Sequence, residues 1–178
     1  GLLMTATAYF GMKSLTILSA IAVPAIAILG STSAMIATSS AGGVQGLMNI
    51  EPANKMALVT AVTLCVGSFI SGGTATPDFV RFSKNKKIAV STTVIAFFIG
   101  NSLMFLVGAI GAMVTGNSDI ADVMFSQGLV IPAILVLGLN IWTTNDNAIY
   151  TAGLGLSNIT KLPKKKMVII CGLIGTVG

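Results

Sequence analysis

Polar side chains are concentrated in one short segment of this otherwise apolar sequence, residues 140–147, which reads NIWTTNDN. On a helix, Asn140, Thr143, Thr144 and Asn147 share one face, because they are spaced three and four residues apart. Hydroxyl and carbonyl oxygens suit a small hard cation such as sodium, by analogy with the oxygen ligands of calcium and magnesium. The segment is therefore a candidate cation site. The alternative is that the two threonine hydroxyls only bond back to carbonyls four residues earlier.

The same segment contains a carboxylate, Asp146, which on a helix points away from the hydroxyl face. A carboxylate inside a membrane bundle is costly and by default marks a functional site or an internal partner. We therefore expect a gating or structural role for Asp146. Trp142, nearby, can pack either inward or outward.

A second segment, GSFISGGTATPD at residues 67–78, combines an apolar run with residues that interrupt helices. Gly72 and Gly73 permit non-helical dihedral angles and Pro77 lacks an amide donor, so we predict a break near residues 71–74. Backbone groups freed at membrane depth can bind a polar ligand, as in the discontinuous helices of transporters. The alternative is a kink that only lets two helices pack closely.

Three side chains beside this predicted break are candidates for contact with a ligand. Ser68 and Ser71 offer hydroxyls, and Phe69 offers an aromatic face that can stack on a planar ring. A gating or structural role is expected for the residues that cause the break, Gly72, Gly73 and Pro77.

The elements that position these segments must be membrane helices, because the composition excludes a water-soluble fold. Of the 178 residues, 54% are hydrophobic and 8% are charged, and the mean hydropathy is +0.93. A soluble domain carries about a quarter charged residues. The sequence has no His, and it shows no nucleophile paired with a base and no metal-ligand cluster. We therefore expect an all-α integral membrane protein that is not an enzyme.

Runs of about 20 apolar residues can cross the hydrocarbon core of a bilayer. The predicted full spans are residues 15–36, 56–80, 88–114 and 129–156, and the predicted partial spans are 2–10 and 167–178. Polar loops are expected at residues 39–54, where a short interfacial turn can be included, and at residues 116–127. Because the sequence starts without Met and ends inside an apolar run, we expect it to be a piece of a longer protein.

The charges of the connecting loops alternate along the chain. Every Lys and Arg except Lys55 falls on one side of the predicted threading, at Lys13 and in the basic loops 81–87 and 161–166. Loops carrying Glu51, Asp119 and Asp122 fall on the other side. The positive-inside rule predicts that the basic loops are cytoplasmic. Short basic loops between apolar spans need no partner but the inner membrane face, so we expect no nucleic acid partner.

Three segments together resemble the nucleobase:cation symporter family. They read GSFISGGTATPDFVRF at 67–82, FFIGNSLMF at 97–105 and LNIWTTNDNAIY at 139–150. The resemblance covers essentially the whole chain. It implies a twelve-helix, leucine-transporter-like fold with a five-plus-five inverted repeat, of which this chain would run from the end of helix 4 to the start of helix 9.

The resemblance also implies roles for the candidate residues. Phe69 would pack against a nucleobase ring, and the Ser68 hydroxyl and the backbone near Ser71 would meet its polar edge. The Asn140 carbonyl with the hydroxyls of Thr143 and Thr144 would bind sodium. Asn140 and Asn145 are candidates for substrate or supporting contacts.

The function that follows from this resemblance is import of cytosine across a bacterial inner membrane, driven by a sodium gradient. No cofactor other than the coupling ion is expected. Uracil, a purine, hydantoin or allantoin remain alternative substrates, and Asp146 leaves open coupling to protons. In a different class, the chain would be a non-transporting membrane scaffold subunit.

Overall fold

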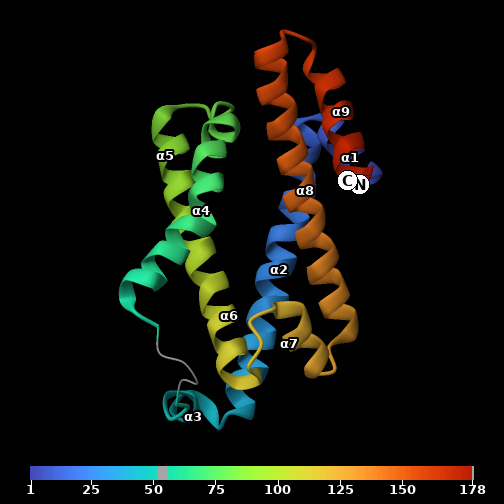
Figure 1. Ribbon diagram of the computed structural model, residues 1–178. Helices are drawn as coiled ribbons and strands as arrows, with labels where there is room; N and C mark the ends of the chain where they lie inside the picture. Colours follow the sequence, from blue (N-terminus) through green and yellow to red (C-terminus); the bar gives the residue numbers. More distant parts are fainter. Residues whose placement is uncertain (52–55, 178) are drawn as a thin grey trace. The chain divides into compact units, whose positions relative to one another are not determined.

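The computed structural model describes residues 1–51 and 56–177, and every regular element in these ranges is a helix (Figure 1). The helices, in chain order, are α1 (Leu2–Phe10), α2 (Met12–Ser40), α3 (Gly43–Met48), α4 (Leu58–Val80), α5 (Lys86–Ile95), the π-helical segment η1 (Ala96–Gly100), α6 (Asn101–Thr115), α7 (Ile120–Ser126), α8 (Val130–Thr160) and α9 (Lys164–Val177). Residue 178 of the predicted partial span 167–178, and residues 52–54 of the predicted loop 39–54, lie outside the described residues.

Three helical stretches among the described residues are long and apolar enough to cross a membrane. They are Met12–Ser40, Leu58–Val80 and Lys86–Thr115. Helix α8 has 31 residues, but the polar segment 140–147 near its middle lowers its hydropathy. The lengths and compositions fit a multi-pass integral membrane protein, in which a helix satisfies its backbone groups without water.

The described chain divides into two compact units, which we treat separately. Unit 1 consists of Gly1–Gly30 and Gly128–Gly178, and unit 2 is Ser31–Gln127. Helix α2 begins in unit 1 and ends in unit 2.

Unit 1 is built on mutual packing of α1, α8 and α9. Gly153 of α8 lies against α9, where an added Cβ would be 3.0 Å from the Val168 Cα and 3.1 Å from its backbone nitrogen. Gly172 of α9 faces the side chain of Thr5 in α1 in the same way. Without a hydrophobic driving force between helices in lipid, small residues of this kind provide close contact.

We expect Gly153→Ala to lower the thermal unfolding midpoint, since the new methyl group meets the backbone of α9 and overpacking costs about 1–3 kcal/mol. Gly155→Ala is the matched control two residues away, because its Cβ would meet no described atom within 4 Å. The measurement is thermal unfolding of the purified membrane protein. Equal midpoints for the two variants would contradict the close α8–α9 contact.

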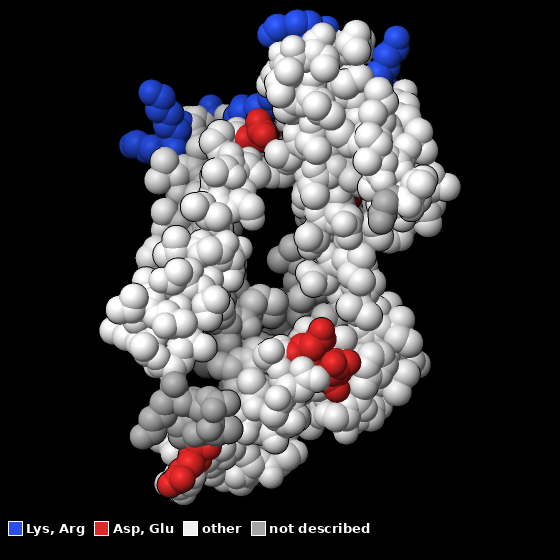
Figure 2. All heavy atoms as spheres, in the orientation of Figure 1, with Lys and Arg blue, Asp and Glu red and all other residues white. Residues whose placement is uncertain are grey.

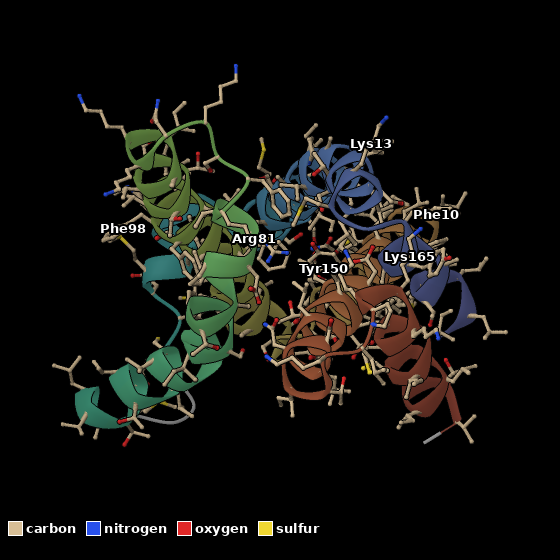
Figure 3. The ribbon with its side chains drawn as sticks, turned by 90° about the horizontal axis from the view of Figure 1, so that it is seen from above. Phe10, Lys13, Arg81, Phe98, Tyr150 and Lys165 are labelled. Carbon is tan, nitrogen blue, oxygen red and sulfur yellow. The ribbon has the colours of Figure 1, made fainter. Side chains whose placement is uncertain are left out.

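Two lysines at the start of α9 cover aromatic rings of unit 1. The Lys164 Nζ lies 4.3 Å from the ring centroid of buried Tyr150, and the Lys165 Nζ lies 5.0 Å from that of Tyr9. Figure 3 shows Tyr150 and Lys165 in this unit. Cation–π contacts of this kind hold part of the basic loop 161–166 onto the helices.

Unit 2 contains a short helix where the sequence analysis predicts a polar loop. Residues 116–127 include α7, whose N-terminus is capped by the Asp119 carboxylate; it accepts hydrogen bonds from the backbone of Ala121 at 2.8 Å and Asp122 at 3.4 Å. The Gln127 side chain, just after α7, makes two hydrogen bonds with the buried Ser33 of α2. Its amide oxygen accepts one from the Ser33 hydroxyl, and its amide nitrogen donates one to the Ser33 backbone carbonyl. The loop prediction is corrected here because the acidic residue satisfies the first helical amides. Helix α3, six residues long, lies in the predicted loop 39–54, for which a short interfacial turn is among the expectations.

Helix α4 also differs from the sequence-based expectation. A break is predicted near 71–74, but the structure is helical through Gly72, Gly73 and Pro77 to Val80 (Figure 1). The Thr74 hydroxyl donates to the Ser71 carbonyl and the Thr76 hydroxyl to the Gly72 carbonyl, each at 2.8 Å. Glycine also adopts helical dihedral angles, and a continuous helix pairs backbone groups that a break would free.

Opposite charges lie at the two ends of the α5–η1–α6 helix within unit 2 (Figure 2). The basic segment 81–87 includes its first two residues, Lys86 and Lys87, and Asp119 and Asp122 follow its last residue. Thirty helical residues span about 45 Å, enough to cross a bilayer. The alternating loop charges predict that a single span has a basic loop at one end and an acidic loop at the other, and this helix has that arrangement.

Candidate functional site

The first candidate group lies on α4 in unit 2. Ser68 and Ser71 are exposed, and the Ser68 hydroxyl donates to the Leu64 carbonyl at 2.7 Å. The Ser71 backbone carbonyl accepts a hydrogen bond from the Thr74 hydroxyl. Because the helix is continuous here, the polar groups available to a ligand are side-chain hydroxyls and helical carbonyls. The unpaired backbone groups that a helix break would provide are not present in α4.

Phe69 lies in an aromatic cluster that the sequence analysis does not identify. Its ring centroid is 5.3 Å from that of Phe105 and 6.4 Å from that of Phe97, with interplanar angles of 78° and 80°. These are edge-to-face contacts, the geometry that aromatic pairs favour. The signal that could have revealed the partners is the segment 97–105, which begins and ends with aromatic residues.

The second candidate group lies on α8 in unit 1. Asn140, Thr143 and Thr144 share one continuous helix, as their spacing requires. The Thr143 hydroxyl bonds back to the carbonyls of Leu139 at 2.8 Å and Asn140 at 3.2 Å. Thr144 is exposed, and its hydroxyl makes no hydrogen bond within the described residues. The alternative to a cation site is that both threonine hydroxyls donate to carbonyls of the preceding turn, and the Thr143 hydroxyl does so.

Asn145 lies on the same helix but faces another environment. Its amide donates to the Ile141 carbonyl at 2.8 Å. It lines a cavity of about 460 Å³ within unit 1, together with residues of α1 and α9. Asn140, Thr143 and Thr144 are absent from the lining of that cavity, so α8 presents two distinct polar positions.

Asp146 is the buried carboxylate of unit 1. Its side chain is 1% exposed, and neither carboxylate oxygen has a hydrogen-bond partner within the described residues. One turn earlier, the Trp142 indole nitrogen donates to the Thr7 hydroxyl of α1 at 3.3 Å. Trp142 therefore packs inward, one of the two possibilities left by the sequence, and Asp146 is buried within the same unit.

Replacing Asp146 with Asn removes a charge from this buried position while keeping the shape of the side chain. We expect Asp146→Asn to raise the thermal unfolding midpoint, because an unsatisfied buried polar group costs about 1–3 kcal/mol and more when charged. A lower midpoint would show that the carboxylate has a stabilising partner in the whole protein.

Comparison with known proteins places the chain in a family. A family described as permease for cytosine/purines, uracil, thiamine, allantoin matches residues 1–178. The chain belongs to this permease family. Curated relatives named cytosine permease from Escherichia coli strain K12, strain CFT073 (O6:H1) and O157:H7 are each 56% identical to it over 177 residues.

The matched region covers nearly all of this chain and part of each relative. It accounts for 99% of the chain and 42% of the length of each of the three relatives. The candidate residues on α4 and α8 therefore belong to a chain that resembles these permeases throughout, and the chain spans less than half of their length.

Proposed function

We propose that the whole permease imports cytosine. The observation that carries this proposal is 56% identity over 99% of the chain to relatives named cytosine permease. The family description also includes purines, uracil, thiamine and allantoin, so a related ring is the alternative substrate. One hydrogen-bonding group on a ring is enough to change which substrate a polar site accepts.

The residues that we propose for substrate binding are on α4 and α8. Phe69, which is partly exposed and held in an aromatic cluster, would stack on the planar ring. The exposed Ser68 hydroxyl and the backbone near Ser71 would meet its polar edge. Asn140 and Asn145 are the amides that would add donors and acceptors.

We propose sodium as the coupling ion, bound by the Asn140 carbonyl and the hydroxyls of Thr143 and Thr144. The exposed Thr144 hydroxyl supports this choice, because no described hydrogen bond occupies it. Bound sodium would raise the affinity for the ring and the ring would raise the affinity for sodium, since coupling between two sites is reciprocal. Buried Asp146 keeps proton coupling as the alternative.

The transport cycle that we propose is alternating access in a leucine-transporter-like fold of twelve helices in a bacterial inner membrane. The basic loops 81–87 and 161–166 would be cytoplasmic, in accordance with the positive-inside rule. Gly72, Gly73 and Pro77 support a gating role for α4, since this part of the helix has low intrinsic helix propensity.

Uptake of radiolabelled cytosine into proteoliposomes that contain the full-length permease tests this function. The assay is run with and without an inward sodium gradient, at fixed pH and membrane potential. Accumulation that depends on sodium supports both substrate and ion. Uptake that does not depend on sodium contradicts the proposed sodium site. Uptake of a related ring but not of cytosine contradicts cytosine as the substrate. A scaffold subunit would take up none of the rings.

A further inference from the structure

The helix that crosses unit 2 from Lys86 to Thr115 is not α-helical throughout. Its segment Ala96–Gly100 is a π-helix, in which hydrogen bonds run from i to i+5, and it separates α5 from α6. Such segments are rare and frequently occur at functional sites. Phe97 lies inside the segment, and Phe105 lies in the α-helix that follows.

The π-helical segment brings these two rings onto one face. Phe105 follows Phe97 by eight positions, and in an uninterrupted α-helix the two side chains would point about 80° apart. Phe97 to Gly100 lie in the wider π-helical turn, where each residue advances the helix by a smaller angle, so the difference falls below that value. Both rings then lie on the same side of the helix, two turns apart.

That side faces α4. Both rings contact Phe69 edge to face, at centroid distances of 6.4 Å for Phe97 and 5.3 Å for Phe105. The backbone of α4 also approaches Phe97, since a Cβ at Gly72 would lie 3.6 Å from the Phe97 Cζ. By contrast Phe98, the neighbour of Phe97, is 74% exposed and lies at the outer edge of the unit (Figure 3).

We propose that Phe97 and Phe105 are positioning residues that set the orientation of the Phe69 ring, and through it the plane in which the transported ring stacks. This inference rests on the proposed function, which makes Phe69 the stacking residue. Two edge-to-face contacts restrict rotation of the Phe69 side chain, so the ring is ordered before substrate arrives. Preordering of a binding group reduces the entropy lost on binding.

The test uses Phe105→Leu and Phe97→Leu in the full-length permease, with labelled cytosine uptake into proteoliposomes as the measurement. Each variant should raise KM about three- to tenfold, the effect of losing one aromatic contact, with the maximal rate per transporter unchanged. Phe105→Tyr keeps the ring and should restore the KM. Phe98→Leu is the matched control, since it removes a ring from the same segment without a contact to Phe69.

A double-mutant cycle with Phe69→Leu separates positioning from general packing. If Phe105 acts through Phe69, then Phe105→Leu should change KM little once Phe69→Leu is present. The same fold-change in both backgrounds, or an equal effect of Phe98→Leu, overturns the inference. An unchanged KM in both Phe97→Leu and Phe105→Leu also overturns it while leaving cytosine import intact. Lack of cytosine uptake by the unmodified permease overturns the proposed function and this inference together.

Discussion

Replacing Thr143 and Thr144 together with Ala is expected to abolish sodium stimulation of cytosine uptake in the full-length permease. Both hydroxyls are proposed ligands of the ion, and each contact of a polar group with a charge contributes about 1.5–3 kcal/mol. Their joint loss should raise the sodium concentration needed for half-maximal stimulation by more than about 100-fold. The measurement is the initial uptake rate as a function of sodium at fixed pH and membrane potential.

Two further variants test whether the loss of sodium stimulation is due to the loss of the two hydroxyls. Replacing both threonines with Ser keeps the oxygens and should preserve stimulation. Thr63→Ala on α4 is the matched control for loss of back-bonding, because its exposed hydroxyl donates to the carbonyl of Val59 as Thr143 does to that of Leu139. Unchanged sodium dependence in the Thr143→Ala, Thr144→Ala double variant would rule out this cation site.

Phe69→Ala is expected to raise KM for cytosine by about 5- to 150-fold. The estimate follows from base–aromatic stacking, which is worth about 1–3 kcal/mol per base when the aromatic residue is replaced by Ala. The effect should exceed that of either Phe97→Leu or Phe105→Leu, because Phe69 is the residue proposed to touch the ring. Uptake kinetics with labelled cytosine measure it.

The controls for Phe69 test aromaticity and location. Phe69→Tyr keeps a six-membered ring and should remain close to the unmodified permease. Phe98→Ala removes a ring that is 74% exposed and should leave KM unchanged. A KM for Phe69→Ala within about twofold of the unmodified value would mean that another residue stacks on the substrate.

The all-helical structure of the described chain could be predicted from the apolar runs in the sequence. Apolar runs such as residues 15–36 must be helical in a bilayer, because a single segment cannot otherwise pair its own amides and carbonyls in hydrocarbon. The shared face of Asn140, Thr143 and Thr144 follows from helical periodicity alone. The family could likewise be inferred from three short segments, and comparison with known proteins confirms it.

Local backbone chemistry accounts for the errors in the element boundaries. A break at 71–74 follows from the low helix propensity of glycine, but propensity is a weak preference that the need to pair backbone groups outweighs in α4. Helix α7 was missed because polar composition suggests a loop, whereas Asp119 acts as a cap that starts a helix.

Periodicity and composition were sufficient for the presence of the long helices, the shared oxygen-rich face and the charge of each loop, because these depend on a residue and its neighbours in sequence. Contacts between helices required the folded chain. The burial of Asp146 with Trp142 against α1, and the contacts of Phe97 and Phe105 with Phe69, join residues that are far apart in sequence. A π-helical segment shifts the phase of the residues after it, so a regular 3.6-residue period misplaces Phe105 relative to Phe97.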